Sequence, residues 1–258
     1  MTAGVHQTAI IDPSAQLDED VAIGPYAVVG PSVRIGRGTT LASHAVVERN
    51  TMIGSLCHVG TGSILGGDPQ DRKYAGEPTW LEIGDETVIR DYSTINRGSA
   101  ARGRTSVGRR CFIMTYVHIA HDCVIEDDVT LANAVQLAGH VHVESNATIG
   151  GSAPGHQFVR IGTHSFVGGG SRVPQDVPPY TRAAGNPLKL YGVNTIGLTR
   201  AGFSPETRLA LKHAYRLLFN SDLTHAQARD QLEREGPQPP EVERLLSFVT
   251  RSERGVLV

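Results

Sequence analysis

The stretch Ile11-Asp-Pro-Ser-Ala-Gln-Leu17-Asp-Glu-Asp-Val-Ala-Ile23-Gly-Pro-Tyr-Ala-Val-Val29-Gly-Pro-Ser-Val-Arg-Ile35 has an aliphatic residue at every sixth position. The same frame runs from Val5 to Val173, and it is broken only at Asp71, Glu77, Ala101 and Gly155. A period of six fits neither an amphipathic helix, whose stripe repeats every 3.6 residues, nor a long strand, whose faces alternate every two. It predicts short strands separated by corners.

Three such strands per turn would close a triangular prism, in which one coil takes about 18 residues and stacks on the next at about 4.8 Å. The position after each aliphatic residue is often glycine, as at Gly24 and Gly30, which we interpret as a corner with unusual backbone angles. The position two before each aliphatic residue is small or β-branched and includes Cys57, Cys111 and Cys123. Without CxxC spacing, the three cysteines are predicted to fill the core.

The composition agrees with a solenoid that has small residues inside. The 258 residues include 29 glycines and only 5% aromatic residues, so large rings cannot fill the interior. A formal net charge of −2 gives no general attraction to nucleic acid or to an anionic membrane. Neither a signal peptide nor an apolar run of about 18 residues is recognisable. We therefore expect a cytoplasmic protein with no integral membrane segment and no nucleic-acid partner.

Two polar, glycine-rich stretches interrupt the repeat without changing its frame, Gly66–Pro78 and Gly98–Ser106. Both are predicted to be loops extruded from a corner. Long ordered loops on a rigid scaffold often carry function, and this favours a functional role for the first loop.

The chain changes character after Val173, and we divide it into a β-solenoid domain, residues 1–191, and a C-terminal α-helical domain, residues 192–258. Ser204-Pro-Glu is a strong helix start, because serine caps the end and proline suits the first turn. An apolar stripe follows at helical spacing, and further helices are predicted from about 224 to 235 and up to about 251. The stripe consists of Leu209, Leu211, Ala214, Leu217 and Leu218.

Five of the 11 histidines lie between positions 118 and 156. In an 18-residue coil, Asp122 stacks under His140, where its carboxylate can bias the imidazole. By the same rule His121 stacks under Gly139. A side chain able to accept a proton would then lie beside a backbone N–H able to receive an oxyanion, an arrangement suited to acyl transfer.

Several motifs resemble those of the UDP-N-acetylglucosamine acyltransferase family of hexapeptide-repeat enzymes, and the resemblance extends over essentially the whole chain. The most specific are the block His118-Ile-Ala-His121-Asp-Cys123 and the block Gly155-His-Gln-Phe158. Three further blocks agree with the family, namely Leu137-Ala-Gly-His-Val141, Asp71-Arg-Lys-Tyr-Ala-Gly-Glu-Pro78 and Gln175-Asp-Val-Pro-Pro-Tyr180.

The resemblance implies a left-handed parallel β-helix and the first step of lipid A biosynthesis, transfer of an (R)-3-hydroxyacyl chain to the 3-hydroxyl of UDP-N-acetylglucosamine. The acyl donor would be acyl carrier protein with its phosphopantetheine, and neither a cofactor nor a metal would be needed. His121 would be the general base, Asp122 would orient it, and the Gly139 N–H would hold the oxyanion. Substrate groups would be bound by Asp71, Lys73, His118, His140, His156, Gln157, Asn194 and Arg200.

The resemblance also implies a homotrimer with sites between adjacent prisms, in which Gly169 would set the permitted acyl length. The chain departs from the family pattern at Pro187, Ile196 and Ala201, positions that concern nucleotide binding. On the first tail helix, Arg208, Lys212 and Arg216 recur every four residues and form one basic face, which is either a solvated surface or a dock for the acidic carrier protein.

Three other functions stay open at the level of the sequence. N-acylation of an amino-sugar nucleotide would use the same base and oxyanion site. A metal hydrase resembling the γ-carbonic anhydrases would hold zinc with three histidines shared between subunits, for which His118 and His121 are candidates. A non-catalytic solenoid would leave the histidine cluster and the alignment of His121 with Gly139 unexplained.

Overall fold

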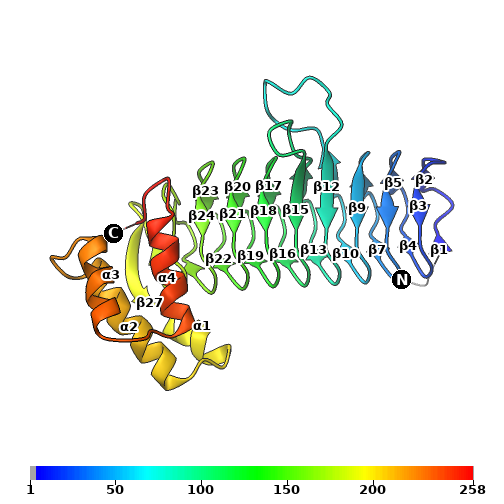
Figure 1. The fold of residues 1–258 in the computed structure, drawn as a ribbon. Helices are drawn as coiled ribbons and strands as arrows, with labels where there is room; N and C mark the ends of the chain where they lie inside the picture. Colours follow the sequence, from blue (N-terminus) through cyan, green and yellow to red (C-terminus); the bar gives the residue numbers. More distant parts are fainter. Residues whose placement is uncertain (1–3, 258) are drawn as a thin grey trace.

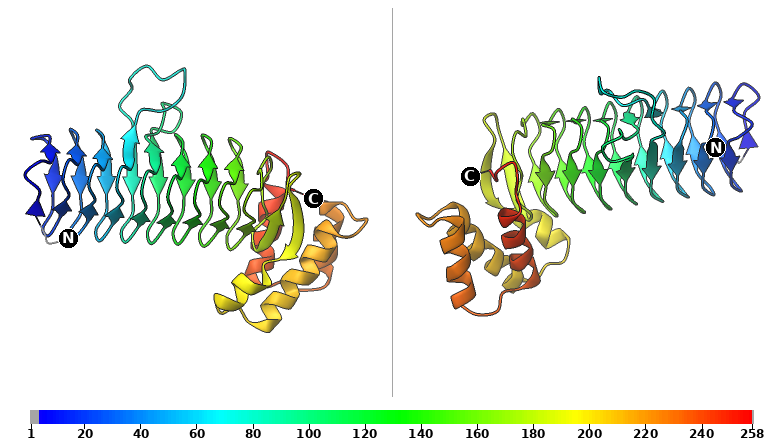
Figure 2. Two further views of the ribbon diagram at one scale, coloured as in Figure 1. Left: turned by 180° about the vertical axis from the view of Figure 1, so that it is seen from behind. Right: turned by 45° about the horizontal axis from the view of Figure 1, so that its top comes forward.

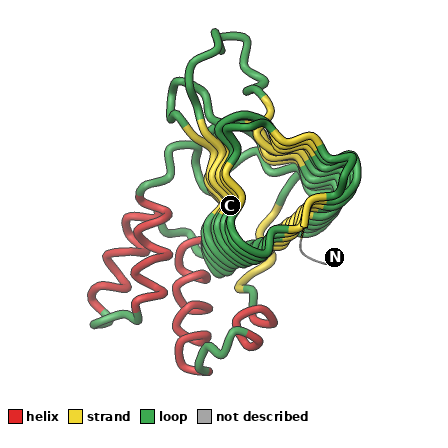
Figure 3. Tube along the Cα trace, turned by 90° about the vertical axis from the view of Figure 1, so that its right-hand side faces the viewer, coloured by secondary structure: helices red, strands yellow, loops and turns green. Residues whose placement is uncertain are grey.

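The computed structural model describes residues 4–257, and its main body is a prism of short parallel strands (Figure 1). Seen along its axis, the prism is triangular, with one sheet on each side (Figure 3). The chain is a left-handed parallel β-helix with helices in its C-terminal region, which confirms the predicted fold class.

Successive strands pass in turn to the first, second and third sheets. The first sheet contains β1 (Gly4–Val5), β4 (Ala22–Ile23), β7 (Thr40–Leu41), β10 (His58–Val59), β13 (Val88–Ile89), β16 (Phe112–Ile113), β19 (Thr130–Leu131), β22 (Thr148–Ile149), β25 (Phe166–Val167), β26 (Thr181–Ala184) and β27 (Lys189–Val193). The second contains β2 (Ile10–Ile11), β5 (Val28–Val29), β8 (Val46–Val47), β11 (Ile64–Gly67), β14 (Thr94–Asn96), β17 (His118–Ile119), β20 (Gln136–Leu137) and β23 (Pro154–Gly155). The third contains β3 (Gln16–Leu17), β6 (Arg34–Ile35), β9 (Thr51–Ile53), β12 (Trp80–Ile83), β15 (Arg104–Val107), β18 (Val124–Ile125), β21 (His142–Val143) and β24 (Arg160–Ile161).

We name the corners by the sheets they join: the first corner joins the first and second sheets, the second corner the second and third, and the third corner the third and first. The register between coils is 18 residues, as in the pairing of Val124 with His142. It grows to 30 between His58 and Val88 and to 24 between Val88 and Phe112. The two interruptions therefore add 12 and 6 residues, multiples of the repeat, and the frame survives them.

Both inserted loops leave the second corner (Figure 2). The long loop, residues 68–79, joins β11 to β12, and the short loop, residues 97–103, joins β14 to β15. The predicted limits were too wide, because residues 66–67 continue β11 and residues 104–106 belong to β15. Pairing with the neighbouring coils holds these residues in the sheets.

The aliphatic column fills the core, and residues such as Leu131 and Ile113 are completely buried. The column two positions earlier also points inward, and its polar members bond to the backbone of the next coil. Thr39 donates to the Gly54 carbonyl at 2.7 Å, and the Cys111 thiol lies 3.1 Å from the Glu126 carbonyl. All three cysteines are free and buried, as predicted, and burial raises the pKa of Cys123 to about 12.

The interpretation of the corner glycines was wrong. Left-handed backbone angles occur two positions later, on residues such as Tyr116, Asp122 and His140. The glycines are needed because the next coil passes close by. A Cβ on Gly36 would lie 2.6 Å from the carbonyl carbon of Gly54, in a backbone contact that no rotamer change relieves.

The prism continues beyond the last repeat. Val173 and Val177 form bridges to the coil below, and β26 adds to the first sheet before β27 returns antiparallel to it. Four helices follow: α1 (Thr195–Arg200), α2 (Pro205–Phe219), α3 (His225–Arg234) and α4 (Pro240–Thr250). No helix within residues 4–257 combines the length and apolar character required to cross a membrane.

The helix starts agree with the sequence signals, since Ser204 caps α2 and Thr224 forms a capping box with Gln227. Short α1 and the β26–β27 hairpin were not predicted, because neither has a repeat or a long apolar stripe. Leu209 was wrongly assigned to the buried stripe: its side chain is 69% exposed, whereas Leu211 is fully buried.

Charged contacts fasten the helices to the prism. Buried Glu144 accepts from Arg160 of the prism at 3.0 Å and from Arg244 of α4 at 3.1 Å. The Arg160 guanidinium also lies 4.4 Å from the ring centre of Phe248 on α4. The helical part is thus held against the last coils in a fixed orientation.

The core position Leu131 and its outward neighbour Thr130 provide a test of this packing. We expect Leu131→Ala to lower the free energy of unfolding by about 2–5 kcal/mol, since a fully buried side chain leaves a cavity. Thr130→Ala should cost less than about 1 kcal/mol. Urea unfolding followed by circular dichroism measures both, and equal losses would contradict the assignment of inward and outward faces.

Candidate active site

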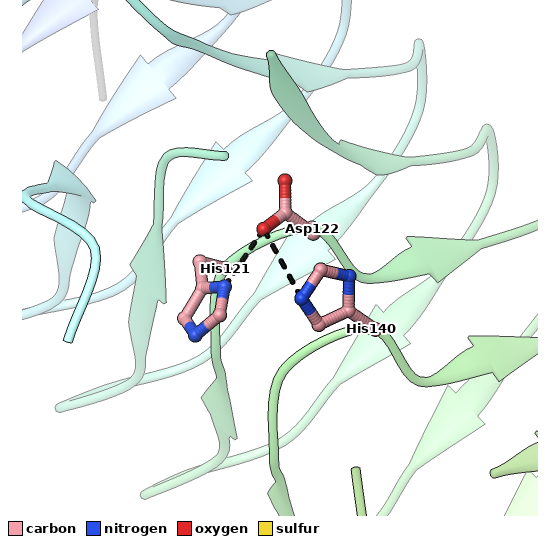
Figure 4. A group of neighbouring side chains, drawn as sticks. All are labelled: His121, Asp122 and His140. Carbon is pink, nitrogen blue, oxygen red and sulfur yellow. Dashed lines mark hydrogen bonds and ion pairs between the residues drawn. The ribbon is translucent and has the colours of Figure 1, made fainter. Parts of the chain in front are cut away.

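His121, Asp122 and His140 meet at the second corner, on two adjacent coils (Figure 4). The Nδ1 atom of His121 lies 2.8 Å from Oδ2 of Asp122, and Nε2 of His140 lies 3.6 Å from the same oxygen. The predicted stacking of Asp122 under His140 is therefore correct. The two imidazole rings meet edge to face, with centroids 5.2 Å apart.

The short inserted loop holds the Asp122 carboxylate. The Ser99 N–H donates to Oδ1 at 2.9 Å, and the Ser99 hydroxyl donates to Oδ2 at 2.6 Å. Burial by itself raises the pKa of Asp122, but the hydrogen bonds from Ser99 and His121 outweigh it and leave the pKa lowered. A fixed, ionised carboxylate at Nδ1 leaves Nε2 of His121 free to exchange a proton.

Gly139 lies against the His121 ring, as the coil length predicted. A Cβ at position 139 would lie 2.8 Å from Nε2 of His121, so only glycine leaves the space in front of this nitrogen open. Among the hydrogen bonds of residues 4–257, none has the Gly139 N–H as donor. A free N–H thus stands next to a free imidazole nitrogen.

The neighbouring histidines have lowered pKa values. Burial, and then the charge of His121, lowers the pKa of His118, whose Nδ1 lies 2.7 Å from the Thr94 hydroxyl. For His140, burial lowers the pKa more than the opposing attraction of Asp122 raises it, and its ring stacks on Phe158 at 4.4 Å. Both rings are neutral near pH 7 and can exchange hydrogen bonds with an uncharged polar ligand.

Other predicted residues surround the same corner. His156 is half-buried and Gln157 is exposed, one coil above Gly139. Asp71 of the long loop lies close enough to raise the pKa of His140, and Lys73 beside it is exposed. Both insertions thus lie at the corner that carries the histidines.

Asn194 and Arg200 lie elsewhere, beside a cavity of about 940 Å³ over the third corner and the first sheet. The cavity is also lined by Phe166, Arg182 and Lys212. The amide of Asn194 caps α1 and donates to the His164 carbonyl at 3.0 Å. One protomer therefore does not bring these two residues to the His121 corner.

Gly169 lies at the first corner. Its φ is not in the left-handed region, which neighbouring Gly170 adopts instead. A Cβ at position 169 would lie 3.2 Å from the Gly151 carbonyl oxygen and meet nothing else closely. Backbone angles therefore do not require glycine at position 169.

The structure adds residues that the sequence did not single out. Ser99 lies in the short loop, to which the sequence assigned no role, and no spacing links it to Asp122 across 23 residues. Phe158 could have been found, because it is one 18-residue step beyond His140. Within residues 4–257, the one cluster with metal-ligand proximity is His121, Asp122 and His140, and it does not contain His118 of the metal-hydrase alternative.

Comparisons with known proteins agree with the geometry. The family model described as Udp N-acetylglucosamine O-acyltransferase, Domain 2, matches residues 176–257. The model described as Bacterial transferase hexapeptide (six repeats) matches residues 14–49 and 104–139.

Similar sequences and solved structures cover the chain almost completely. Acyl-[acyl-carrier-protein]--UDP-N-acetylglucosamine O-acyltransferase of Thermodesulfovibrio yellowstonii is 50% identical over 98% of this chain and 98% of its own. The protein of the same name from Alkalilimnicola ehrlichii is 47% identical over 96% and 97%. UDP-N-acetylglucosamine O-acyltransferase from Moraxella catarrhalis is 44% identical, with a TM-score of 0.96 over 98% of this chain and 99% of its own. On the fold, the site and these similarities, the chain belongs to the UDP-N-acetylglucosamine O-acyltransferase family.

Proposed function

We propose that this enzyme transfers an (R)-3-hydroxyacyl chain from acyl carrier protein to the 3-hydroxyl of UDP-N-acetylglucosamine, the first step of lipid A biosynthesis. The observation that carries the proposal is the free Nε2 of His121 beside the free N–H of Gly139, with Asp122 at Nδ1. Such a pair of proton acceptor and oxyanion donor is what attack of a hydroxyl on a thioester requires.

The chemistry follows from these atoms. Nε2 of His121 takes the proton of the sugar hydroxyl as its oxygen attacks the thioester carbon. The carbonyl oxygen becomes an oxyanion and accepts from the Gly139 N–H. When the intermediate collapses, the C–S bond breaks, and the phosphopantetheine thiolate receives the proton back from His121. Asp122 stabilises the transient imidazolium without itself taking the proton.

The neighbouring groups suit the remaining parts of the substrates. The imidazoles of His118, His140 and His156 offer hydrogen bonds to sugar or acyl groups, with Gln157, Asp71 and Lys73 at the rim. The cavity beside Asn194 has an aromatic ring, Phe166, and the cations Arg182, Arg200 and Lys212, which suit a nucleoside diphosphate. Ile196 lines this cavity and supplies no charge.

A homotrimer would complete the site. His121 lies at the second corner, the nucleotide cavity at the third and Gly169 at the first. A ligand that reaches all three must bridge neighbouring prisms, and threefold packing of triangular prisms brings different corners together. We place the enzyme in the cytoplasm, where its three unpaired cysteines would stay reduced.

The partner surface is the basic face of α2. Lys212 and Arg216 lie beside Leu209, an exposed apolar side chain, in a shallow hollow that Glu206 also lines, and Arg208 reaches the Thr199 hydroxyl. Cations around one exposed apolar anchor suit an acidic carrier protein. No cofactor beyond the carrier's phosphopantetheine enters the scheme.

The decisive experiment incubates the protein with UDP-N-acetylglucosamine and 3-hydroxyacyl carrier proteins of several lengths. Mass spectrometry should find one acyl group, released by mild alkali as expected of an ester. If the enzyme acylates only a 3-amino analogue and the product is an alkali-stable amide, the activity is N-acylation and not O-acylation. Hydration of carbon dioxide by zinc-loaded protein, without acyl transfer, would overturn both.

His121→Ala should remove nearly all turnover, because loss of a general base typically costs 10²- to 10⁴-fold, about two to four powers of ten. The variant should keep the oligomeric state and thermal midpoint of the parent, and His6→Ala in the first coil is the matched control. Steady-state kinetics measure the effect. More than about a tenth of the activity remaining would move the role of base to another residue.

Reversal of Arg208, Lys212 and Arg216 to Glu should raise KM for the acyl carrier protein about tenfold or more and flatten its salt dependence. Because Lys212 also lines the nucleotide cavity, KM for the sugar nucleotide is measured in parallel. Reversal of exposed Arg229 and Arg234 on α3 is the control. An unchanged KM for the carrier would make the basic face an ordinary solvated surface.

Gly169→Met should shift the preference to acyl chains several carbons shorter while turnover continues, because each methylene kept out of the groove forfeits about 0.8 kcal/mol. The φ of Gly169 allows a side chain, and the Gly151 carbonyl oxygen, 3.2 Å from an added Cβ, would have to shift by a few tenths of an ångström. Competition among carrier proteins of different acyl length measures the shift. If the folded variant keeps the length preference of the parent, a residue other than Gly169 sets the permitted acyl length.

A further inference from the structure

Arg97 is the largest side chain that the structure buries completely, and its guanidinium has 0% exposure. It follows β14 directly, where the chain turns into the short loop. A buried guanidinium requires acceptors for its N–H groups and a charge to balance it. In Arg97 the partners of Nη1 and Nη2 come from the end of β11 and from the long loop, whereas the buried Nε has no partner among the described residues.

The contacts of Arg97 lie on both sides of the loop tip. Its Nη1 donates to the Gly66 carbonyl, and its Nη2 donates to Oδ1 of Asp68. The same Nη2 lies 3.3 Å from the Tyr74 hydroxyl. Asp71 and Lys73 lie between Asp68 and Tyr74 in sequence, so one guanidinium ties down both ends of the segment that carries them.

Hydrogen bonds within the long loop connect the residues that Arg97 holds to the tip of the loop, where Asp71 and Lys73 lie. The Asp71 carboxylate accepts from the Lys73 N–H at 3.0 Å, and the Tyr74 hydroxyl donates to the Glu77 carbonyl at 3.0 Å. The amide of Asn96, next to Arg97, donates to the Asp68 carbonyl at 2.9 Å. A displacement at Asp68 or Tyr74 would therefore move Asp71.

The exposure of the partners is unequal. The carboxylate of Asp68 is 58% exposed, whereas the Arg97 guanidinium that it neutralises is not exposed at all. If the loop lifted away, Arg97 would lose its contacts with Asp68 and Tyr74 and the charge that balances it, whereas the exposed Asp68 would lose little. The cost of opening is concentrated on Arg97, which makes it the clamp of the loop.

We propose that Arg97 is a positioning residue of the enzyme, which clamps the long loop so that Asp71 and Lys73 stand over the His121 corner. Because its side chain is completely buried, Arg97 would act through the loop and not on the substrate. Its neighbour Ser99 holds Asp122, so the four residues 96–99 fix both the substrate loop and the catalytic pair. The kinetic consequence rests on the proposed function, whereas the clamp itself does not.

Limited trypsin digestion tests the clamp without reference to activity. Cleavage after Arg72 and Lys73 reports opening of the loop, and fragment masses identify the sites. We expect Arg97→Gln to accelerate this cleavage about tenfold or more, since proteolysis tracks the population of the open segment. Arg49→Gln is the matched control, because Arg49 reaches the same Asp68 oxygen at 3.2 Å but is 49% exposed. It should change the rate less than about twofold.

Steady-state kinetics distinguish positioning from general destabilisation. Arg97→Gln should raise KM for UDP-N-acetylglucosamine about tenfold with a smaller change in kcat, because Asp71 and Lys73 bind and do not react. Arg97→Lys should restore part of the effect, since it keeps the charge but not the fork that reaches three acceptors. Tyr74→Phe removes the hydrogen bond between Arg97 and the Tyr74 hydroxyl and leaves the buried charge in place. This variant replaces the Arg97 variants in both tests if they do not fold.

An unchanged cleavage rate in folded Arg97→Gln and in Tyr74→Phe would overturn the proposal. If cleavage becomes faster in both variants but KM for UDP-N-acetylglucosamine does not change, Arg97 holds the loop without positioning Asp71 and Lys73 for the substrate, and the positioning role is overturned. If the parent enzyme does not use UDP-N-acetylglucosamine, the proposed function fails, yet the digestion still decides whether Arg97 clamps the loop.

Discussion

The 18-residue coil is the constraint on which the rest of this protein depends. Outside the two insertions each coil hydrogen-bonds to the next with the same register, so a residue lies over the one 18 positions earlier, as His142 lies over Val124. Side chains far apart in sequence are thereby held at one corner by the backbone itself. In this way the His121–Asp122 pair lies beside Gly139, the proposed oxyanion donor, and beside the stacked rings of His140 and Phe158.

The same constraint decides where extra residues can enter. The insertions of 12 and 6 residues leave the strands on either side paired with the inward column intact, because the added residues are extruded from the corner as loops. Both insertions lie at the second corner. There Ser99 donates a hydrogen bond to Asp122, and the long loop brings Asp71 near His140. The repeat holds the corner residues in fixed positions. The two loops add side chains, such as Ser99 and Asp71, that a flat prism face does not provide.

The residues assigned to the proposed site lie at different corners of one prism. His121, the proposed proton acceptor, lies at the second corner, and the cavity with its cations lies at the third, beside the helices. Figure 3 shows the long loop and the helices on different sides of the triangle. In the proposed homotrimer, different corners of neighbouring prisms would meet, so different protomers would contribute nucleotide binding and the chemistry at His121.

Much of this architecture is local in sequence and could be predicted from it. The aliphatic column fixed the prism, the coil length aligned Asp122 with His140 and His121 with Gly139, and Ser204 and Thr224 marked helix starts through capping. Tertiary structure alone decided the features that depend on close approach or on loops without a repeat. Position 36 requires glycine because the next coil passes close to it, and Leu209 faces outward. Ser99 binds Asp122 across 23 residues, and Arg97 binds Asp68 across 29. No period encodes such contacts, because an extruded loop folds back according to the charges it must bury and neutralise.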